Sequence, residues 1–131
     1  MRATANRQDG GFKHEVDAGG HDVTVDEPEE NGGTDEGPSP QELLAASLAS
    51  CTAITIEMYA QRKGWEIGDL AVHVDYEPAQ RGSPTKFAMK VLMPKELPEE
   101  QRERLMQIAA KCPVHRTLEG EVMFDERVEV T

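Results

Sequence analysis

Two cysteines are the residues of this chain with the most telling chemistry, and they are the only cysteines among its 131 residues. Cys51 lies inside a long apolar run, and Cys112 stands immediately before Pro113. Two thiols that meet in a folded chain can be oxidised to a disulfide and reduced again. The sequence therefore makes this protein a candidate dithiol redox protein, provided that the fold brings the two sulfurs together.

The surroundings of Cys112 favour a thiolate. Proline favours the first position of a helix, so Cys112 is the expected N-cap of a short helix that begins at Pro113. Free backbone amides and the positive end of the helix dipole lower a thiol pKa at that position, as would the nearby Arg116 or a protonated His115. The alternative is an inert cysteine that only caps the helix.

The surroundings of Cys51 have the opposite effect. An apolar position in the middle of a helix raises a thiol pKa, and free cysteine is among the residues that proteins bury most often. Taken alone, Cys51 is expected to be a core residue. A neighbouring cation or an adjoining cavity would be needed to activate it.

Metal binding is another use for two thiols. Structural zinc sites need closely spaced pairs of ligands, and this chain has no Cys-x-x-Cys motif. His14, His21 or His115 could complete such a site if the fold gathered them around the cysteines. The sequence favours redox chemistry over this alternative and implies no metal and no cofactor.

Composition limits the partners. Asp and Glu outnumber Lys and Arg by 25 to 14, which gives a net charge of −11. A surface of that sign repels phosphates, so nucleic acid is not an expected partner.

Residues 1–11 hold no apolar segment of a secretory signal, and we expect no membrane span. The expected location is the cytoplasm, where a permanent disulfide is less common than a redox or metal pair.

A long helix is the element that must position Cys51. Residues 39–63 predict it, with Ser39 as N-cap, Pro40 at the first helical position and Glu42 completing a capping box. Apolar residues cover nearly every face of this helix, so we expect it to be buried on all sides. At 1.5 Å per residue it would be about 37 Å long, which makes a second subunit the expected source of extra cover.

Shorter elements complete an α+β pattern. The expected elements are a hairpin of strands at 12–16 and 21–25, an acidic loop at 26–38, a second hairpin at 68–77 and 85–93, a helix at 98–111, a short helix from Cys112 and a closing strand that contains Val122, Phe124, Val128 and Val130. We expect one domain over residues 1–131, with residues 1–10 flexible.

Two segments carry a family resemblance. Residues 37–52, which contain the first cysteine, and residues 112–118, which read Cys-Pro-Val-His-Arg-Thr-Leu, resemble the OsmC/Ohr family. Residues 26–28 and 58–65 look like an uncharacterised branch of OsmC-like proteins. The resemblance implies an OsmC-like α+β fold, with antiparallel sheets around a long central helix, and an intertwined homodimer.

The resemblance also implies an activity, the reduction of organic hydroperoxides. By this similarity Cys51 is the peroxidatic thiolate that attacks the O–O bond, and Cys112 resolves the resulting sulfenic acid as a disulfide. An external dithiol reductant would then reduce that disulfide. These roles reverse the order that the local surroundings of the two cysteines suggest.

The sequence departs from the family pattern in the groups that support the thiolate. Peroxidases of the family use an arginine for this purpose, held by a glutamate ten residues before the first cysteine, a position that is Gln41 here. Glu42 is adjacent, but one residue turns it about 100° around the helix. The loop at 26–38 contains no arginine, which leaves Arg116 as the substitute and Arg7 as a weaker one.

Two other functions remain open at this stage. Without a cation beside it, a buried Cys51 stays protonated, and the fold could be a non-catalytic dimer that binds a small apolar ligand in a crevice beside Cys51. The cysteine pair could also be a redox sensor that forms a disulfide without turnover.

Overall fold

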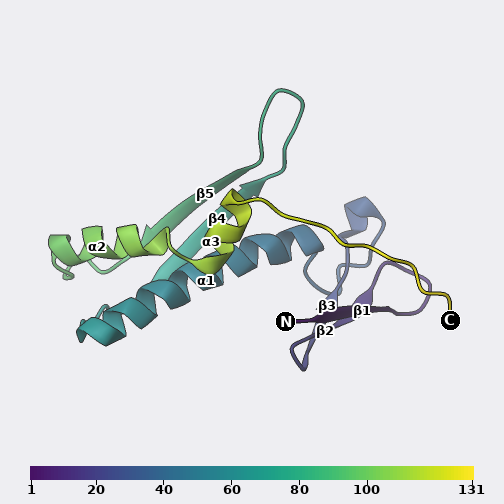
Figure 1. The fold of residues 1–131 in the computed structure, drawn as a ribbon, viewed down its shortest axis with the longest axis horizontal. Helices are drawn as coiled ribbons and strands as arrows, with labels where there is room; N and C mark the ends of the chain where they lie inside the picture. The colour runs from purple at the N-terminus through teal and green to yellow at the C-terminus, as the bar shows by residue number, and fades with distance from the viewer. The chain divides into compact units, whose positions relative to one another are not determined.

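Two antiparallel sheets and one long helix make up the α+β fold (Figure 1). The computed structural model describes residues 1–131, and the chain divides into two compact units. The first unit comprises Met1–Ala46 and Asp75–Ala88, and the second comprises Ser47–Val74 and Met89–Thr131. The expectation of a single domain stays a prediction.

A three-stranded sheet forms much of the first unit. Its strands, in spatial order, are β1 (Ala3–Arg7), β2 (His14–Ala18) and β3 (His21–Val25). Gly19 and Gly20 form the turn between β2 and β3 with φ angles of 61° and 86°, a region in which glycine is not strained. The first predicted hairpin is confirmed, and it is extended by β1, which lies in the segment expected to be flexible.

One buried carboxylate organises the loop after β3. Asp26 is 2% exposed, and its carboxylate accepts hydrogen bonds from the backbone N–H groups of Glu27 (2.8 Å) and Glu36 (3.2 Å). It also accepts from the N–H and the hydroxyl of Thr34, at 3.3 and 2.8 Å. Burial raises the pKa of Asp26, but the hydrogen bonds outweigh it and the pKa is lowered. The loop, with its short helix η1 (Glu29–Asn31), is thereby held in one conformation.

Helix α1 (Pro40–Lys63) begins with the predicted capping box. The Ser39 hydroxyl accepts a hydrogen bond from the Glu42 N–H at 3.1 Å, and the Glu42 carboxylate accepts one from the Ser39 N–H at 3.0 Å. The helix ends before Gly64, whose φ of 70° is typical of a C-terminal cap. The sequence therefore predicted both ends of the helix correctly.

The burial of α1 differs from the prediction. Its buried residues form a single stripe with a spacing of four: Leu48, Thr52, Ile56 and Ala60. Ile54 and Met58 are 53% and 59% exposed, so the expectation of burial on all sides is wrong for a single chain, which covers one face of the helix.

By length and composition alone α1 could cross a membrane. This is weak evidence of a membrane span, because core helices of soluble proteins pass the same test.

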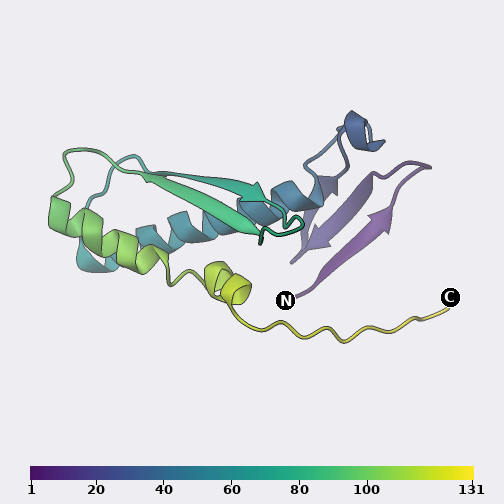
Figure 2. The ribbon, with the colours of Figure 1, turned by 90° about the horizontal axis from the view of Figure 1, so that it is seen from above.

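The core of the second unit lies between α1 and the elements that follow it (Figure 2). Strands β4 (Ala71–Glu77) and β5 (Lys86–Leu92) form the second predicted hairpin, and α2 (Glu99–Ala109) is the second predicted helix. Ile56 and Ala60 of α1 pack with Leu97, Leu105 and Ala109, and the partly buried Val91 and Met93 join them.

The C-terminal part of the chain contradicts one prediction. Helix α3 (Pro113–Glu119) is the expected short helix, but residues 121–131 form no strand. Val122 and Phe124 are 56% and 81% exposed. The predicted closing strand is wrong for the single chain, because an alternating pattern becomes a strand where a second strand shares its backbone hydrogen bonds.

Candidate active site

The two cysteines meet within the second unit, where α3 approaches the middle of α1 (Figure 1). Cys51 lies on α1, and Cys112 is the N-cap of α3. Both are free thiols, and they lie close enough for each to shift the pKa of the other. Cys112 has no exposed surface, whereas Cys51 is half-buried. One chain alone thus brings together the two sulfurs on which the redox hypothesis depends.

Cys112 is the thiol that loses its proton more easily. Burial raises its pKa and is the largest single influence on it. Hydrogen bonds from the Cys51 thiol and from the backbone N–H of His115, which lies 3.4 Å from Sγ, act against burial. The Thr52 hydroxyl and the Val114 N–H add to them, and the net pKa of Cys112 is lowered.

Cys51 keeps its proton more firmly. Burial raises its pKa, and the hydrogen bond with Cys112 raises it further, because a thiol must be protonated to donate. The Val114 N–H and the Thr55 hydroxyl lower the pKa of Cys51, but by less. Of the two thiols, Cys112 is therefore the one that ionises first as the pH rises.

Of the two candidate supporting residues beside Cys112, only His115 acts on the sulfur, and it does so through its backbone. His115 reaches the sulfur through its N–H, while its imidazole contacts the Glu119 carboxylate one turn further along α3. Arg116 is exposed, and none of the larger influences on either thiol comes from a cationic side chain. Hydrogen bonds, rather than a guanidinium, favour the thiolate in this chain.

The two candidates near the start of α1 have other surroundings. Gln41 is exposed on the first turn of the helix. Glu42 is held in the capping box, and the hydrogen bonds from the Ser39 N–H and the Ser39 side chain lower its pKa. Glu42 therefore satisfies the helix N-terminus and forms no ion pair with an arginine.

Two threonines beside Cys51 were missed by the sequence analysis. Thr52 follows Cys51 directly, and Thr55 lies one helical turn further on. Each hydroxyl acts on a different sulfur of the pair, Thr52 on Cys112 and Thr55 on Cys51. A hydroxyl residue one turn from a cysteine on the same helix was the available signal for Thr55. The role of Thr52 could not be read from the sequence, because it depends on where α3 lies.

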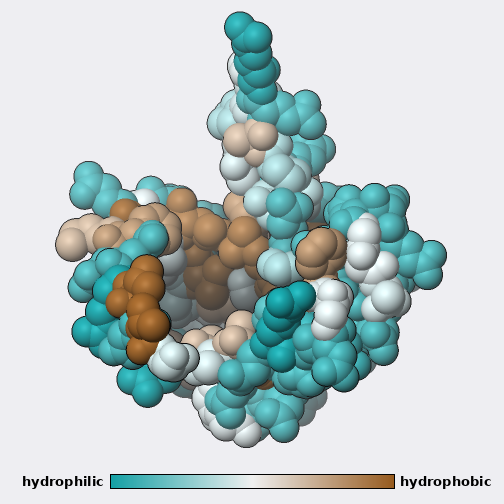
Figure 3. Space-filling view, turned by 90° about the vertical axis from the view of Figure 1, so that its right-hand side faces the viewer, coloured by the Kyte–Doolittle hydropathy of each residue, from teal (hydrophilic) through white to brown (hydrophobic).

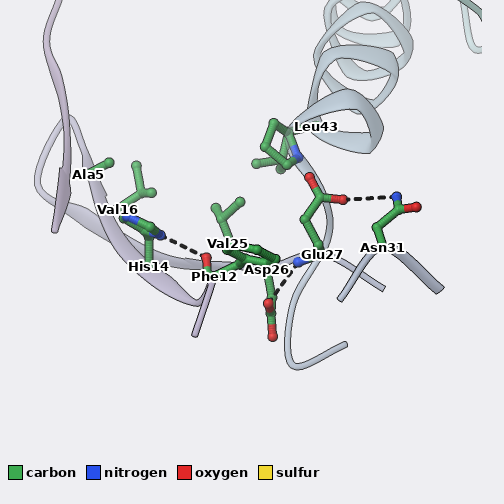
Figure 4. Close-up of a pocket in the computed structure, with 10 residues that line it drawn as sticks. Ala5, Phe12, His14, Val16, Val25, Asp26, Glu27, Asn31 and Leu43 are labelled. Atoms are coloured by element: carbon green, nitrogen blue, oxygen red, sulfur yellow. Dashed lines mark hydrogen bonds between the residues drawn. The ribbon is translucent and has the colours of Figure 1, made fainter. Parts of the chain in front are cut away.

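An apolar cavity of about 740 Å³ lies in the first unit (Figure 4). Its lining residues come from the sheet, the loop after β3 and the start of α1: Ala5, Phe12, His14, Val16, Val25, Asp26, Glu27, Asn31, Pro40 and Leu43. Figure 3 shows one face of the molecule, on which hydrophobic side chains are exposed. Cys51 does not line this cavity, so the apolar site is not the crevice beside Cys51 that the sequence suggested.

No group of three or more His, Cys, Asp or Glu side chains is placed to hold a metal ion. The histidines considered as additional ligands are therefore not gathered around the two cysteines. His14, for example, lies on β2, where its Nδ1 is 2.8 Å from the Phe12 carbonyl oxygen.

A long helix that carries one of two interacting thiols, in an α+β fold, defines a candidate dithiol redox protein. The family model described as OsmC-like protein matches residues 33–127, and the chain therefore belongs to the OsmC-like family. This confirms the resemblance that the two cysteine-containing segments carry. No curated protein matches the chain.

Solved structures of OsmC/Ohr proteins share the fold. An OsmC-like protein from Mycoplasma pneumoniae aligns with a TM-score of 0.70 at 21% identity, over 91% of this chain and 86% of that one. The organic hydroperoxide resistance protein OsmC from Legionella pneumophila has a TM-score of 0.66 at 23% identity, over 91% and 88%. The organic hydroperoxide resistance protein OhrB of Bacillus subtilis has a TM-score of 0.60 at 24% identity, over 91% and 90%. The expected fold class is confirmed.

Proposed function

We propose that this protein is a thiol-dependent reductase of organic hydroperoxides that acts through Cys51 and Cys112. The observation that carries the proposal is the proximity of the two thiols, each of which shifts the pKa of the other. The names of the Legionella and Bacillus proteins, which refer to organic hydroperoxide resistance, support the substrate class. The proposed enzyme is a cytoplasmic homodimer that is regenerated by an external dithiol.

Exposure and charge together support the roles of the two cysteines. A hydroperoxide can reach the half-buried Cys51, whereas Cys112 has no exposed surface. Because the pKa of Cys51 is raised, Cys51 keeps its proton longer than Cys112, and that proton must leave as the sulfur attacks. Cys112, whose pKa is lowered, is the acceptor for that proton when it is ionised. The same thiolate then supplies the resolving sulfur.

The proposed cycle has three steps. The Cys51 sulfur attacks the O–O bond and takes one oxygen, and the departing alkoxide takes the proton held by Cys112 and leaves as an alcohol. The Cys112 thiolate then attacks the sulfenic acid of Cys51, so that a disulfide forms and hydroxide leaves, and a proton from the solvent converts the hydroxide to water. An external dithiol reduces the disulfide by thiol–disulfide exchange. One hydroperoxide and one dithiol thus give one alcohol, one water and one oxidised dithiol.

A peroxide assay tests this function. The reduced protein, mixed with tert-butyl hydroperoxide and a dithiol, is expected to consume the peroxide over many turnovers. Cys51→Ser should abolish consumption, and Cys112→Ser should stop after one oxygen is added to Cys51, which mass spectrometry detects. Absence of turnover in the unaltered protein, or full turnover by Cys51→Ser, would reject the proposal.

The cavity in the first unit favours a second candidate function, the binding of a small apolar ligand. Its walls include Phe12, Val16, Val25 and Leu43, and a cavity of this size can hold a small organic molecule. An environment-sensitive apolar dye should bind the unaltered protein and bind more weakly to Val16→Glu. Equal binding by Val16→Glu and the unaltered protein would exclude this cavity as the site.

A further inference from the structure

We propose that the Thr52 hydroxyl is a positioning group of the dithiol site, and that it donates a hydrogen bond to the Cys112 sulfur when that sulfur is negatively charged. This inference deepens the proposed function and depends on it for its biological purpose, although its test does not use a peroxide. Thr52 would act through Cys112 in the role that family peroxidases give to an arginine.

The burial of Thr52 is the first observation behind this proposal. Its side chain is fully buried on α1, and Oγ1 has no hydrogen bond of regular geometry. A buried hydroxyl without a partner is uncommon in folded proteins, because desolvation costs free energy that no bond returns. The oxygen nevertheless lies close enough to the Cys112 sulfur to favour its thiolate.

Other hydroxyls on helices of this protein behave differently. Thr117 of α3 donates to the Pro113 carbonyl oxygen at 3.0 Å, and Ser50 of α1 donates to the Ser47 carbonyl oxygen at 3.3 Å. Both bonds are the usual way in which a helix satisfies a Ser or Thr side chain. Thr52 makes no such bond, so the helix does not use its hydroxyl, and the Cys112 sulfur is the acceptor beside it.

Thr55 provides a matched comparison on the same helix. Its hydroxyl favours a negative charge on Cys51, whereas that of Thr52 favours the charge on Cys112. The two threonines therefore favour ionisation of different sulfurs of the pair. Removing each hydroxyl in turn should affect one sulfur and not the other.

Ultraviolet absorbance of the thiolate, followed against pH in variants with a single cysteine, tests the proposal. In Cys51→Ser, where Cys112 is the remaining thiol, Thr52→Val should raise the Cys112 pKa by about one to two pH units, the effect of one hydrogen bond to a charged group. Thr52→Ser should keep the low value, and Thr55→Val should leave it unchanged. In Cys112→Ser, Thr55→Val should raise the Cys51 pKa and Thr52→Val should not.

Stability separates the proposal from a purely structural role. If Thr52→Val stabilises the protein against urea but leaves the Cys112 pKa unchanged, the hydroxyl is only an unpaired core group and the proposal is overturned. Thr52→Ala repeats the measurement without the added methyl group, in case Val disturbs the packing. If the Cys112 pKa depends on Thr52 as predicted but the protein does not turn over peroxide, the proposed function is rejected and this inference stands.

Discussion

At the scale of single residues, hydrogen bonds lower the pKa of Cys112, an effect for which the sequence suggested a cationic side chain. The Cys112 thiolate is favoured by two backbone N–H groups, the Cys51 thiol and a threonine hydroxyl. Backbone donors are fixed by the start of α3 and carry no charge of their own, so they are less sensitive to salt than an exposed arginine would be. Arg116, by contrast, is exposed and is not among the main influences on the pKa of Cys112.

The clearest prediction for a single residue outside the dithiol site concerns Tyr59. Its hydroxyl accepts a hydrogen bond from Arg104 Nε at 3.0 Å, which lowers the phenol pKa, and the charges of Arg104, Lys63 and Arg62 add to this effect. Tyr59 should therefore ionise at lower pH than a free tyrosine side chain, as measured by phenolate absorbance in Tyr76→Phe, where Tyr59 is the remaining tyrosine. In the same background, Arg104→Gln should raise the Tyr59 pKa. A Tyr59 pKa that Arg104→Gln leaves unchanged would contradict this assignment.

At the scale of elements, the capping box of α1 gives a pH dependence. Hydrogen bonds from Ser39 hold the pKa of Glu42 below its ordinary value of 4.5. Because the folded-state pKa is lowered, the ionised carboxylate stabilises the protein fully above the unfolded-state pKa, and this contribution is lost as the pH falls through the folded-state pKa.

Urea unfolding of the unaltered protein and Glu42→Gln checks this sign. The difference between their free energies of unfolding should be constant near neutral pH and should shrink once the pH falls below about 4.5. The neighbouring Gln41→Ala is the control, since Gln41 is exposed and makes no capping bond, and its difference should not vary with pH in this way. A difference that grows as the pH falls would show that the sign is wrong.

The packing of α2 against α1 gives a second prediction at this scale. Leu105 has no exposed surface and belongs to the core of the second unit, so Leu105→Ala leaves a cavity as well as losing apolar burial. We expect a loss of about 2–5 kcal/mol in the free energy of unfolding. The adjacent Met106 is 47% exposed, and Met106→Ala should change stability by less than about 0.5 kcal/mol. Similar effects for both variants would mean that Leu105 does not anchor α2.

At the scale of the whole molecule, the apolar surface of a single chain supports the proposed homodimer. Ile54 and Met58 are more than half exposed on one side of α1, and Val128 and Val130 near the C-terminus are 90% and 94% exposed. Monomeric soluble proteins seldom leave many large apolar side chains in water. A second copy of the chain is the partner that the proposed function calls for.

Light scattering after size-exclusion chromatography measures this directly. The unaltered protein should have twice the chain mass of 14.5 kDa. Ile54→Glu combined with Met58→Glu adds charge to the exposed side of α1 and should shift the protein toward the mass of one chain. Glu57→Gln, also exposed on α1, is the control and should remain a dimer. A single-chain mass for the unaltered protein would exclude the homodimer.

Local sequence signals predicted much of the fold. The capping box at Ser39, the glycine after Lys63 and the proline after Cys112 fix helix ends through contacts between residues close in the chain. Alternation predicted both hairpins for the same reason. The two wrong predictions, burial of α1 on all sides and a strand within residues 122–130, have the same cause. Both depend on which other element packs against the segment, and a periodic pattern does not show which element that is.

The sequence alone determined the family, the two cysteines as candidate site residues and the N-cap position of Cys112, because these depend on residue identity and on neighbours within one turn. Only the tertiary structure decided that Cys51 and Cys112 are close, that no cationic side chain is among the main influences on their pKa values, and that the Thr52 hydroxyl acts on the second sulfur. Those facts depend on how α3 packs against α1, and a thiol pKa depends on atoms within a few ångströms, whichever part of the chain supplies them.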